Sequence, residues 1–457
     1  MKMKKMALIS MIMILLTACT SKSGGEIQVS GKPNLVGAYQ EMNLPTYWID
    51  KLDNPDELIM SKKQIEDFNK KITDSEATKC IDLDSYKKTL EKDELLEKLR
   101  LYTVPEEPRY IDDIAVSDDY YEQLLSNRNE AKVKDENPVR FGVIIQNTQV
   151  RNFPTSDVSY SEANDIDFDM GCESVLKSGE RVLILHESAD QNWQYVQAYN
   201  YIGWVKTEDT AYCTSDEWKS IAENTDWLTV TGNRIILDVN NSNLKVSSKE
   251  FTMGTKFMLV KDKPLDVDGV FTESSYVVSI PTREENGDLK LVETRIPQGL
   301  DVTEGFLEYT PRNVITQAFK MLGERYGWGG LWNARDCASY IMDVYHCFGV
   351  NLPRNADSQA AVPAKRVDVL KYSDEQKEAL ILKQPIGTLL EINGHIMIYI
   401  GEYGGKPFVI QQAFSFIPKE DEKLVTAGCS FVSNLEIKRG NTGKSFLREI
   451  RTINAIQ

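Results

Sequence analysis

A cysteine at the start of one predicted helix has the setting of a nucleophile. Cys337 follows Asp336, and the residues from Cys337 to Phe348 suit a helix that Gly349 ends. In the first turn of a helix, backbone N–H groups and the positive end of the helix dipole favour a thiolate. We therefore expect the pKa of Cys337 to lie below the usual value of about 8.5, and its sulfur to attack a carbonyl carbon.

Three histidines could supply the base that such a thiol needs. His186 lies in a strand-like segment of a different, upstream domain. His346 lies nine residues after Cys337, on the opposite face of the same predicted helix and about 13 Å along its axis. His395 lies at the start of the buried strand-like stretch 394–401, directly after Gly394. By elimination, we predict that His395 is the base.

The predicted strand 408–413 offers two amides to orient the imidazole, Gln411 and Gln412. Successive strand residues point to opposite faces, so only one of the two can reach His395. A neutral amide can fix the histidine tautomer, as Asn does in papain-like sites. We choose Gln412 as the third member of the site.

The elements that would position these residues indicate a multidomain α+β protein. The N-terminal part is helical and charged, with a capping box at 61–64 and helices expected at 92–102 and 118–127. Short β-rich segments separated by turn residues follow. The predicted domains are an N-terminal signal segment (1–19), a tether and helical N-terminal domain (20–136), two small β-barrels (137–216 and 217–307) and a C-terminal α+β domain (308–457).

The N-terminus has the pattern of an export signal. Three lysines within residues 2–5 precede the apolar stretch 6–16, which is too short to span a membrane. Residues 16–19, Leu-Thr-Ala-Cys, are similar to the bacterial lipobox, so Cys19 is expected to become a lipidated N-terminus. An ordinary signal peptide with a chance cysteine is the alternative. We expect an exported protein, anchored to the bacterial cell envelope by lipid alone.

Composition and cysteine spacing exclude two classes of site. The formal net charge of −16 argues against nucleic-acid binding. The six cysteines after Cys19 form no CxxC pair and have no histidine at ligand spacing, so no metal site is expected. In an exported protein some of them could pair, for instance Cys172 with Cys213.

An acidic loop lies between the first two strands of the first predicted barrel. Residues 162–169 contain Glu162, Asp165, Asp167 and Asp169. One interpretation is a solvated loop without a specific role. The other is a patch that binds the ammonium group of a substrate.

Residues 311–450 resemble the NlpC-type papain-like peptidases of bacterial cell walls. The matching motifs are Tyr326-Gly327-Trp328-Gly329-Gly330, Asp336-Cys337, Leu352-Pro353-Arg354 with Gln359, and Gly394-His395 through Tyr399-Ile400-Gly401. Upstream, Arg151-Asn152-Phe153-Pro154, Trp193 and Gly203-Trp204-Val205 resemble a bacterial SH3-like domain. The whole order is similar to a subgroup with a helical segment and two SH3-like barrels before the peptidase.

The resemblance implies cleavage of the γ-D-glutamyl–diamino-acid amide of murein stem peptides, without a cofactor. In the subgroup the substrate typically has a free N-terminal L-Ala, whose amine the first barrel binds. The implied roles are nucleophile for Cys337, base for His395, third member for Gln412, oxyanion donor for Tyr326, groove lining for Asp336 and Ser339, support for Arg354, and substrate contacts for Trp328, Asp165 and Asp167. For Tyr326 and Trp328, plain packing is the alternative.

Three positions depart from the family pattern. Gln412 stands where the third residue is most often His, and Ala338 and Ala356 stand where the family usually has Ser. These changes leave two other functions open: a murein-binding lipoprotein with a degenerate peptidase domain, or a different thiol acyl-transfer enzyme. The expected partners are murein stem peptides and, through the lipid, a membrane.

Overall fold

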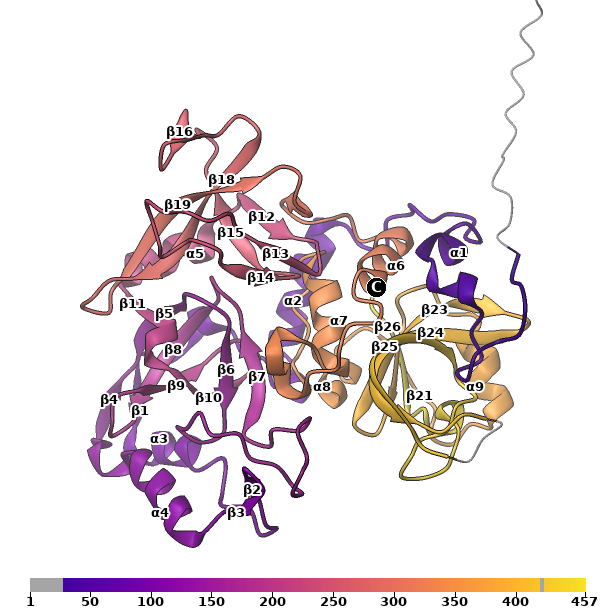
Figure 1. Cartoon of the computed structure of the whole chain (residues 1–457), viewed down its shortest axis with the longest axis horizontal. Coiled ribbons are helices and arrows are strands. Elements are labelled where there is room, and N and C mark those ends of the chain that lie inside the picture. The colour runs from indigo at the N-terminus through magenta and orange to yellow at the C-terminus, as the bar shows by residue number, and fades with distance from the viewer. Residues whose placement is uncertain (1–27, 420–422) are drawn as a thin grey trace, which may run out of the picture.

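The computed structural model describes residues 28–419 and 423–457 (Figure 1). The predicted signal peptide, the lipidation site Cys19 and the start of the tether lie outside the described residues. Within those two ranges, no helix is both long enough and apolar enough to cross a membrane. In Figure 1 two β-rich regions lie on one side and a third sheet on the other, with helices α7 and α8 between them.

The C-terminal domain, residues 310–457, is built on a six-stranded antiparallel sheet in the order β21-β26-β22-β23-β24-β25. Its strands are β21 (Lys365–Asp368), β22 (Leu389–Ile392), β23 (His395–Tyr403), β24 (Lys406–Phe416), β25 (Val425–Asn434) and β26 (Thr452–Ala455). Its helices are α6 (Pro311–Phe319), α7 (Cys337–His346), α8 (Ala356–Ala360), α9 (Asp374–Ile381) and α10 (Phe446–Glu449). The apolar faces of α6 and α7 share one buried core with β22, β23 and β24. This core fixes the helix that carries Cys337 against the strand that carries His395.

The first β-domain, residues 140–213, is a seven-stranded antiparallel sheet in the order β11-β5-β8-β9-β10-β6-β7. Its strands are β5 (Arg140–Ile144), β6 (Thr148–Arg151), β7 (Cys172–Leu176), β8 (Arg181–Glu187), β9 (Trp193–Gln197), β10 (Ile202–Lys206) and β11 (Thr210–Cys213). Trp204 pairs with Tyr195 across β9 and β10, and both side chains are buried. Cys172 and Cys213 both carry free thiols, so they do not form a disulfide.

The second β-domain, residues 227–304, follows the connecting helix α5 (Ser215–Glu223). Its main sheet has the order β19-β18-β15-β12-β20, beside the two-stranded sheets β13-β14 and β16-β17. The strands are β12 (Trp227–Val230), β13 (Arg234–Ile236), β14 (Glu250–Thr252), β15 (Lys256–Leu259), β16 (Asp266–Val267), β17 (Val270–Phe271), β18 (Ser275–Arg283), β19 (Leu289–Pro297) and β20 (Val302–Glu304). A separate apolar cluster around Phe251 and Phe257 forms its core.

The N-terminal residues do not form a helical domain with a core of its own, which corrects the expectation for residues 20–136. Its helices are α1 (Pro45–Ile49), α2 (Lys62–Thr73), α3 (Lys92–Leu99) and α4 (Asp118–Asn127), and β1 (Thr89–Glu91) pairs with β4 (Glu136–Pro138). Trp48 of α1 packs on Phe408 of the C-terminal sheet, with ring centroids 5.4 Å apart. Leu95 of α3 joins the core of the first β-domain. Short amphipathic helices depend on such tertiary partners for stability, and here the partners are two different domains.

A buried chain of ion pairs joins the first β-domain to α7. Lys177 Nζ lies 2.5 Å from Asp343 Oδ1, and Arg335 Nε lies 2.6 Å from Asp343 Oδ2. Arg335 also pairs with Glu324 at 2.7 Å. All four side chains are at most 7% exposed. Because Arg335 lies two residues before Cys337, this network connects the domain junction to the start of α7.

Candidate active site

Cys337 is the first residue of α7, as the sequence predicted. Asp336 is the N-cap: its Oδ1 accepts a hydrogen bond from the Ser339 backbone N–H at 2.9 Å, and Ser339 Oγ accepts one from the Asp336 N–H at 3.0 Å. This reciprocal capping box satisfies backbone donors that a helix start otherwise leaves free. It also fixes the orientation of the residue between them in sequence, Cys337, which is only 8% exposed.

Asp336 and Arg354 form a buried ion pair behind the nucleophile. Arg354 Nη2 lies 2.5 Å from Asp336 Oδ2, and Arg354 Nε donates to Ser174 Oγ of β7 at 2.9 Å. The Asp336 carboxylate also accepts from the Gly329 N–H at 3.2 Å. Protein donors thus hold both oxygens of Asp336, and its expected place in the lining of the substrate groove stays a prediction. Arg354 supports the site, and it ties the site to the first β-domain.

The orienting amide is Gln411, not Gln412, which corrects the sequence prediction. Gln411 Oε1 lies 2.8 Å from His395 Nε2, and Gln411 Nε2 donates to Ser433 Oγ at 2.7 Å. The second bond fixes which end of the amide faces the ring. Because an amide oxygen only accepts, the neutral imidazole carries its proton on Nε2, and Nδ1 is left as the bare basic nitrogen.

Gln412 lies on the other face of β24, as the alternation of a strand requires. Its Nε2 donates to the backbone carbonyls of Arg325 and Arg335, at 2.9 Å each. Gln412 thus holds the segment that leads into Cys337. The sequence narrowed the choice to two adjacent residues, and only the register of β24 against β23 decides between them.

Replacing Gln411 and Gln412 separately tests this assignment. We expect Gln411→Ala to lower kcat by about 10- to 100-fold, because the imidazole loses its fixed tautomer. This loss is part of the rate acceleration of about 10²- to 10⁴-fold that general-base catalysis contributes. Gln412→Ala should mainly lower the melting temperature, because two buried carbonyls lose their donor. Steady-state kinetics and thermal unfolding of both variants measure these effects. The reverse pattern would show that Gln412 is the orienting residue.

The pKa shifts at this site favour a neutral thiol and a neutral imidazole, not the thiolate that the sequence predicts. The backbone N–H of Ile396, the residue after His395, interacts with the Cys337 thiol. Burial, and then the nearby Asp336 carboxylate, raise the pKa of Cys337 to about 12. Burial is the main cause that lowers the pKa of the partly exposed His395 to about 4. A helix dipole contributes only about 0.3–2 kcal/mol, which does not offset desolvation of the thiolate here.

Alkylation of Cys337 at several pH values tests this neutral pair. Because its pKa is raised, the thiolate fraction is small at neutral pH and grows about tenfold per pH unit from pH 6 to 9. We expect the rate of iodoacetamide labelling at Cys337, measured by mass spectrometry of its peptide, to follow that rise. A labelling rate that is already level at pH 6 would instead show a preformed thiolate–imidazolium pair.

Tyr326 lies close to the nucleophile, within an aromatic cluster. Burial raises the pKa of Tyr326 well above its usual value, and the charge of a Cys337 thiolate raises it further. Phe168 of the first β-domain lies 6.2 Å from Tyr326, 5.4 Å from Trp328 and 4.5 Å from Phe414, measured between ring centroids. Trp328 is half-buried in this packing. Phe168 was not singled out by the sequence, because one aromatic residue in an acidic loop has no distinguishing pattern.

The two consecutive glycines of the 326–330 motif let the first β-domain approach. Gly329 and Gly330 have φ of 60° and 95°. A Cβ on Gly329 would lie 2.5 Å from the Cys172 carbonyl oxygen, and one on Gly330 would lie 2.4 Å from the Val175 side chain. Only glycine fits both the left-handed backbone and this contact. The motif therefore encodes domain packing next to the active site.

The acidic loop contacts the C-terminal domain at the same place. Asp167 Oδ1 lies 2.9 Å from Nη2 of Arg325, the residue that precedes Tyr326. Asp165 Oδ1 accepts a hydrogen bond from the Asp167 backbone N–H at 2.9 Å. Asp169 is fully buried and pairs with Arg151 at 2.7 Å. The structure therefore places Asp167 against Arg325, next to Tyr326 in the sequence, while Asp165 binds the backbone of Asp167 and Asp169 supports the loop from within.

Glu173 of β7 is a further carboxylate near the site that the sequence did not reveal. It lies between Cys172, whose thiol contacts the Gly329 carbonyl, and Ser174, which binds Arg354. Tyr201 Oη donates to Glu173 Oε2 at 2.6 Å. One glutamate in a strand has no distinguishing sequence pattern, so only its contact with Tyr201 in the folded chain marks it.

Comparisons with known proteins agree with this architecture. Two family models match parts of the chain: an SH3 domain of the SH3b1 type over residues 159–206, and the NlpC/P60 family over residues 323–415. Among solved structures, a novel NlpC/P60 endopeptidase from Photobacterium damselae subsp. piscicida is similar with a TM-score of 0.72 and 19% identity, covering 90% of this chain and 96% of that chain. An NlpC/P60 family protein from Bacillus cereus ATCC 10987 has a TM-score of 0.44 and 16% identity, and the match covers 69% of this chain and 98% of that chain. No curated protein matches.

Proposed function

Since this chain carries an NlpC/P60 domain behind an SH3 domain of the SH3b1 type, we propose that it is a cysteine peptidase of cell-wall peptides. Members of the NlpC/P60 family are cysteine peptidases. The observation that carries the proposal is the hydrogen bond from His395 Nε2–H to Gln411 Oε1 beside a capped, helix-opening Cys337. It leaves a bare Nδ1 to act as the base.

The proposed reaction is hydrolysis through an acyl-enzyme. His395 Nδ1 takes the thiol proton as Cys337 Sγ attacks the amide carbonyl carbon, and the oxyanion is stabilised by the Cys337 backbone N–H and the Tyr326 hydroxyl. His395 then gives the proton to the leaving amine, and the C–N bond breaks. Water loses a proton to His395 and attacks the thioester, which releases the acid and restores the thiol. No step needs a cofactor.

For the substrate, we propose the γ-D-glutamyl–diamino-acid amide of murein stem peptides with a free N-terminal L-Ala. The first β-domain supplies three carboxylates around the aromatic cluster and the Asp336–Arg354 pair: Asp165, Asp167 and Glu173. A peptide ammonium is the complementary charge. We also keep the proposal that Cys19 is lipidated and that the protein acts, exported and anchored, at the bacterial cell envelope.

Product identity tests the proposal directly. The purified chain is incubated with L-Ala-γ-D-Glu-diaminopimelate, and the products are identified by mass spectrometry, with Cys337→Ala as the blank. We expect L-Ala-γ-D-Glu and free diaminopimelate from the native chain alone. A different cleaved bond would refute the proposed specificity. Absence of cleavage, together with retained binding to sacculi, would instead favour a murein-binding protein with a degenerate peptidase domain.

Acetylation of the substrate amine tests the carboxylates. We expect N-acetylation to lower kcat/KM by about 10- to 100-fold, because a charge-assisted hydrogen bond contributes about 1.5–3 kcal/mol. Glu173→Gln should cause a similar loss with the free amine and little further loss with the acetylated peptide. Glu162→Gln serves as the control, because Glu162 is an exposed carboxylate of the acidic loop 162–169. Equal kcat/KM for both peptides would show that the amine is not bound.

A further inference from the structure

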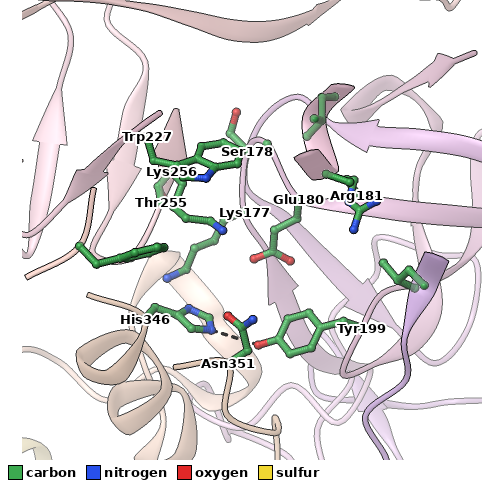
Figure 2. Close-up of a pocket in the computed structure, with 16 residues that line it drawn as sticks. Lys177, Ser178, Glu180, Arg181, Tyr199, Trp227, Thr255, Lys256, His346 and Asn351 are labelled. Atoms are coloured by element: carbon green, nitrogen blue, oxygen red, sulfur yellow. Dashed lines mark hydrogen bonds between the residues drawn. The ribbon is translucent and has the colours of Figure 1, made fainter. Parts of the chain in front are cut away.

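A second cavity lies where the three domains meet, away from the catalytic pair. Its volume is about 220 Å³, and it lies among residues 177–181 and 199 of the first β-domain, residues 227 and 254–256 of the second, and His346 and Asn351 of the C-terminal domain (Figure 2). His346 is the last residue of α7, whereas Cys337 is the first. At 1.5 Å per residue the two ends of this helix are about 13 Å apart, so the cavity is a separate site.

Two opposite charges face this cavity without an ion-pair partner within 4 Å. The Glu180 carboxylate accepts a hydrogen bond from the Lys177 backbone N–H. Within the described ranges, however, neither the Glu180 carboxylate nor the Lys256 ammonium forms an ion pair shorter than 4 Å, and the Lys256 ammonium makes no hydrogen bond. Figure 2 shows both side chains, together with Lys177 and His346, directed into the same space. Lys177 differs, because its ammonium is paired with Asp343 at 2.5 Å. Glu180 and Lys256 therefore lie on the two sides of a gap that the protein itself does not fill.

The surroundings make these two charges costly to keep unpaired. Burial raises the pKa of Glu180 to about 7 and lowers that of Lys256. Lys256 Nζ lies 4.8 Å from the ring centroid of Trp227 and 5.6 Å from that of Phe306. A partly desolvated ion is stable only with a partner of opposite charge and hydrogen bonds. Both ions gain such partners if one molecule brings an ammonium group and a carboxylate together.

We propose that this cavity binds a small zwitterion, a free amino acid or a dipeptide. Its ammonium group faces Glu180 and its carboxylate faces Lys256, while Trp227 and Phe306 form an apolar wall for the side chain. Asn351 is exposed and lies at the edge of the cavity, where its amide can bond to a peptide group. A few placed polar groups on mainly apolar walls are the usual composition of a small-molecule site.

Water is the competing occupant. At about 30 Å³ per molecule, a volume of about 220 Å³ would hold several waters. If water alone fills the cavity, it solvates both ions, and no added solute should bind there in a saturable way. A zwitterion site predicts binding that depends on both charges of the solute and on both side chains.

Calorimetric titration separates these possibilities. The purified full-length chain carrying Cys337→Ala, which cannot turn peptides over, is titrated with L-alanine and L-alanyl-L-alanine up to about 10 mM. We expect saturable binding of at least one of them, and at least about tenfold weaker binding of N-acetyl-L-alanine and L-alaninamide, which each lack one charge. Glu180→Gln and Lys256→Met, added separately, should each weaken binding at least about tenfold.

The controls make every outcome decisive. Lys261→Met removes an exposed lysine of the second β-domain that pairs with Asp226, and should leave binding unchanged. Since neither side chain forms an ion pair shorter than 4 Å, and Gln at position 180 keeps an oxygen that can accept from the Lys177 N–H, both variants should melt within a few degrees of the parent. No binding up to about 10 mM, or binding that Glu180→Gln and Lys256→Met leave unchanged, would overturn the proposal. The second outcome would place the peptide elsewhere, for instance at Cys337.

Discussion

Replacing Cys337 or His395 with Ala is expected to lower kcat for murein peptide cleavage by at least about 10⁴-fold. Groups that act as one unit in nucleophilic catalysis each cost nearly the full effect when removed, so the double variant should be hardly slower than either single variant. The raised pKa of Cys337 strengthens this expectation. With a pKa of about 12 the thiol needs His395 to take its proton as it attacks.

Product release measured by chromatography, in the two single variants and the double variant, checks this coupling. Cys213→Ala is a matched control, because Cys213 is a partly buried free cysteine of the first β-domain. It should retain the native rate. Losses that multiply in the double variant would show that Cys337 and His395 contribute independently. Retained activity in His395→Ala would show that another residue is the base.

The order and type of the catalytic elements could be predicted from sequence, because local signals fix them. The capping residue before Cys337 and the glycine before His395 define a helix start and a strand start, and α7 and β23 begin at those residues. The boundaries of α4 were equally local, since Asp118–Asn127 forms as expected. In each case, the residue pattern and the backbone preference point the same way.

The misassigned residues depend on contacts that sequence alone does not specify. Gln411 and Gln412 are chemically identical neighbours, and register alone separates them. The partner of Asp336 was equally hidden, because Arg354, which binds its carboxylate, lies 18 positions later in the sequence. Burial raises the pKa of Cys337, and the sequence signals that mark a helix start do not indicate how deeply its first residue is buried. The N-terminal helices lacked a common core because their partners lie in two other domains.

The ion-pair chain at the domain junction should give the largest loss of stability in the molecule. Asp343→Ala leaves Lys177 and Arg335 as buried cations without their shared partner. Breaking a buried pair by removing one side costs about 3–5 kcal/mol, because the remaining charge stays desolvated. Asp56→Ala is the matched control: it removes a carboxylate that is 70% exposed and paired with Arg312, and it should leave the free energy of unfolding nearly unchanged, because solvent screens such a pair.

The pH dependence of the Asp343 effect has a definite sign. Although burial alone would raise it, Lys177 and Arg335 hold the pKa of Asp343 below its usual value. A carboxyl with a lowered folded-state pKa stabilises the protein above its unfolded pKa of about 3.9, and this contribution is lost as the pH falls through the folded value. The stability difference between native and Asp343→Ala protein should therefore be constant from about pH 5 to 8 and shrink below about pH 4. Urea unfolding at each pH measures it, and a difference that grows on acidification would contradict the assignment.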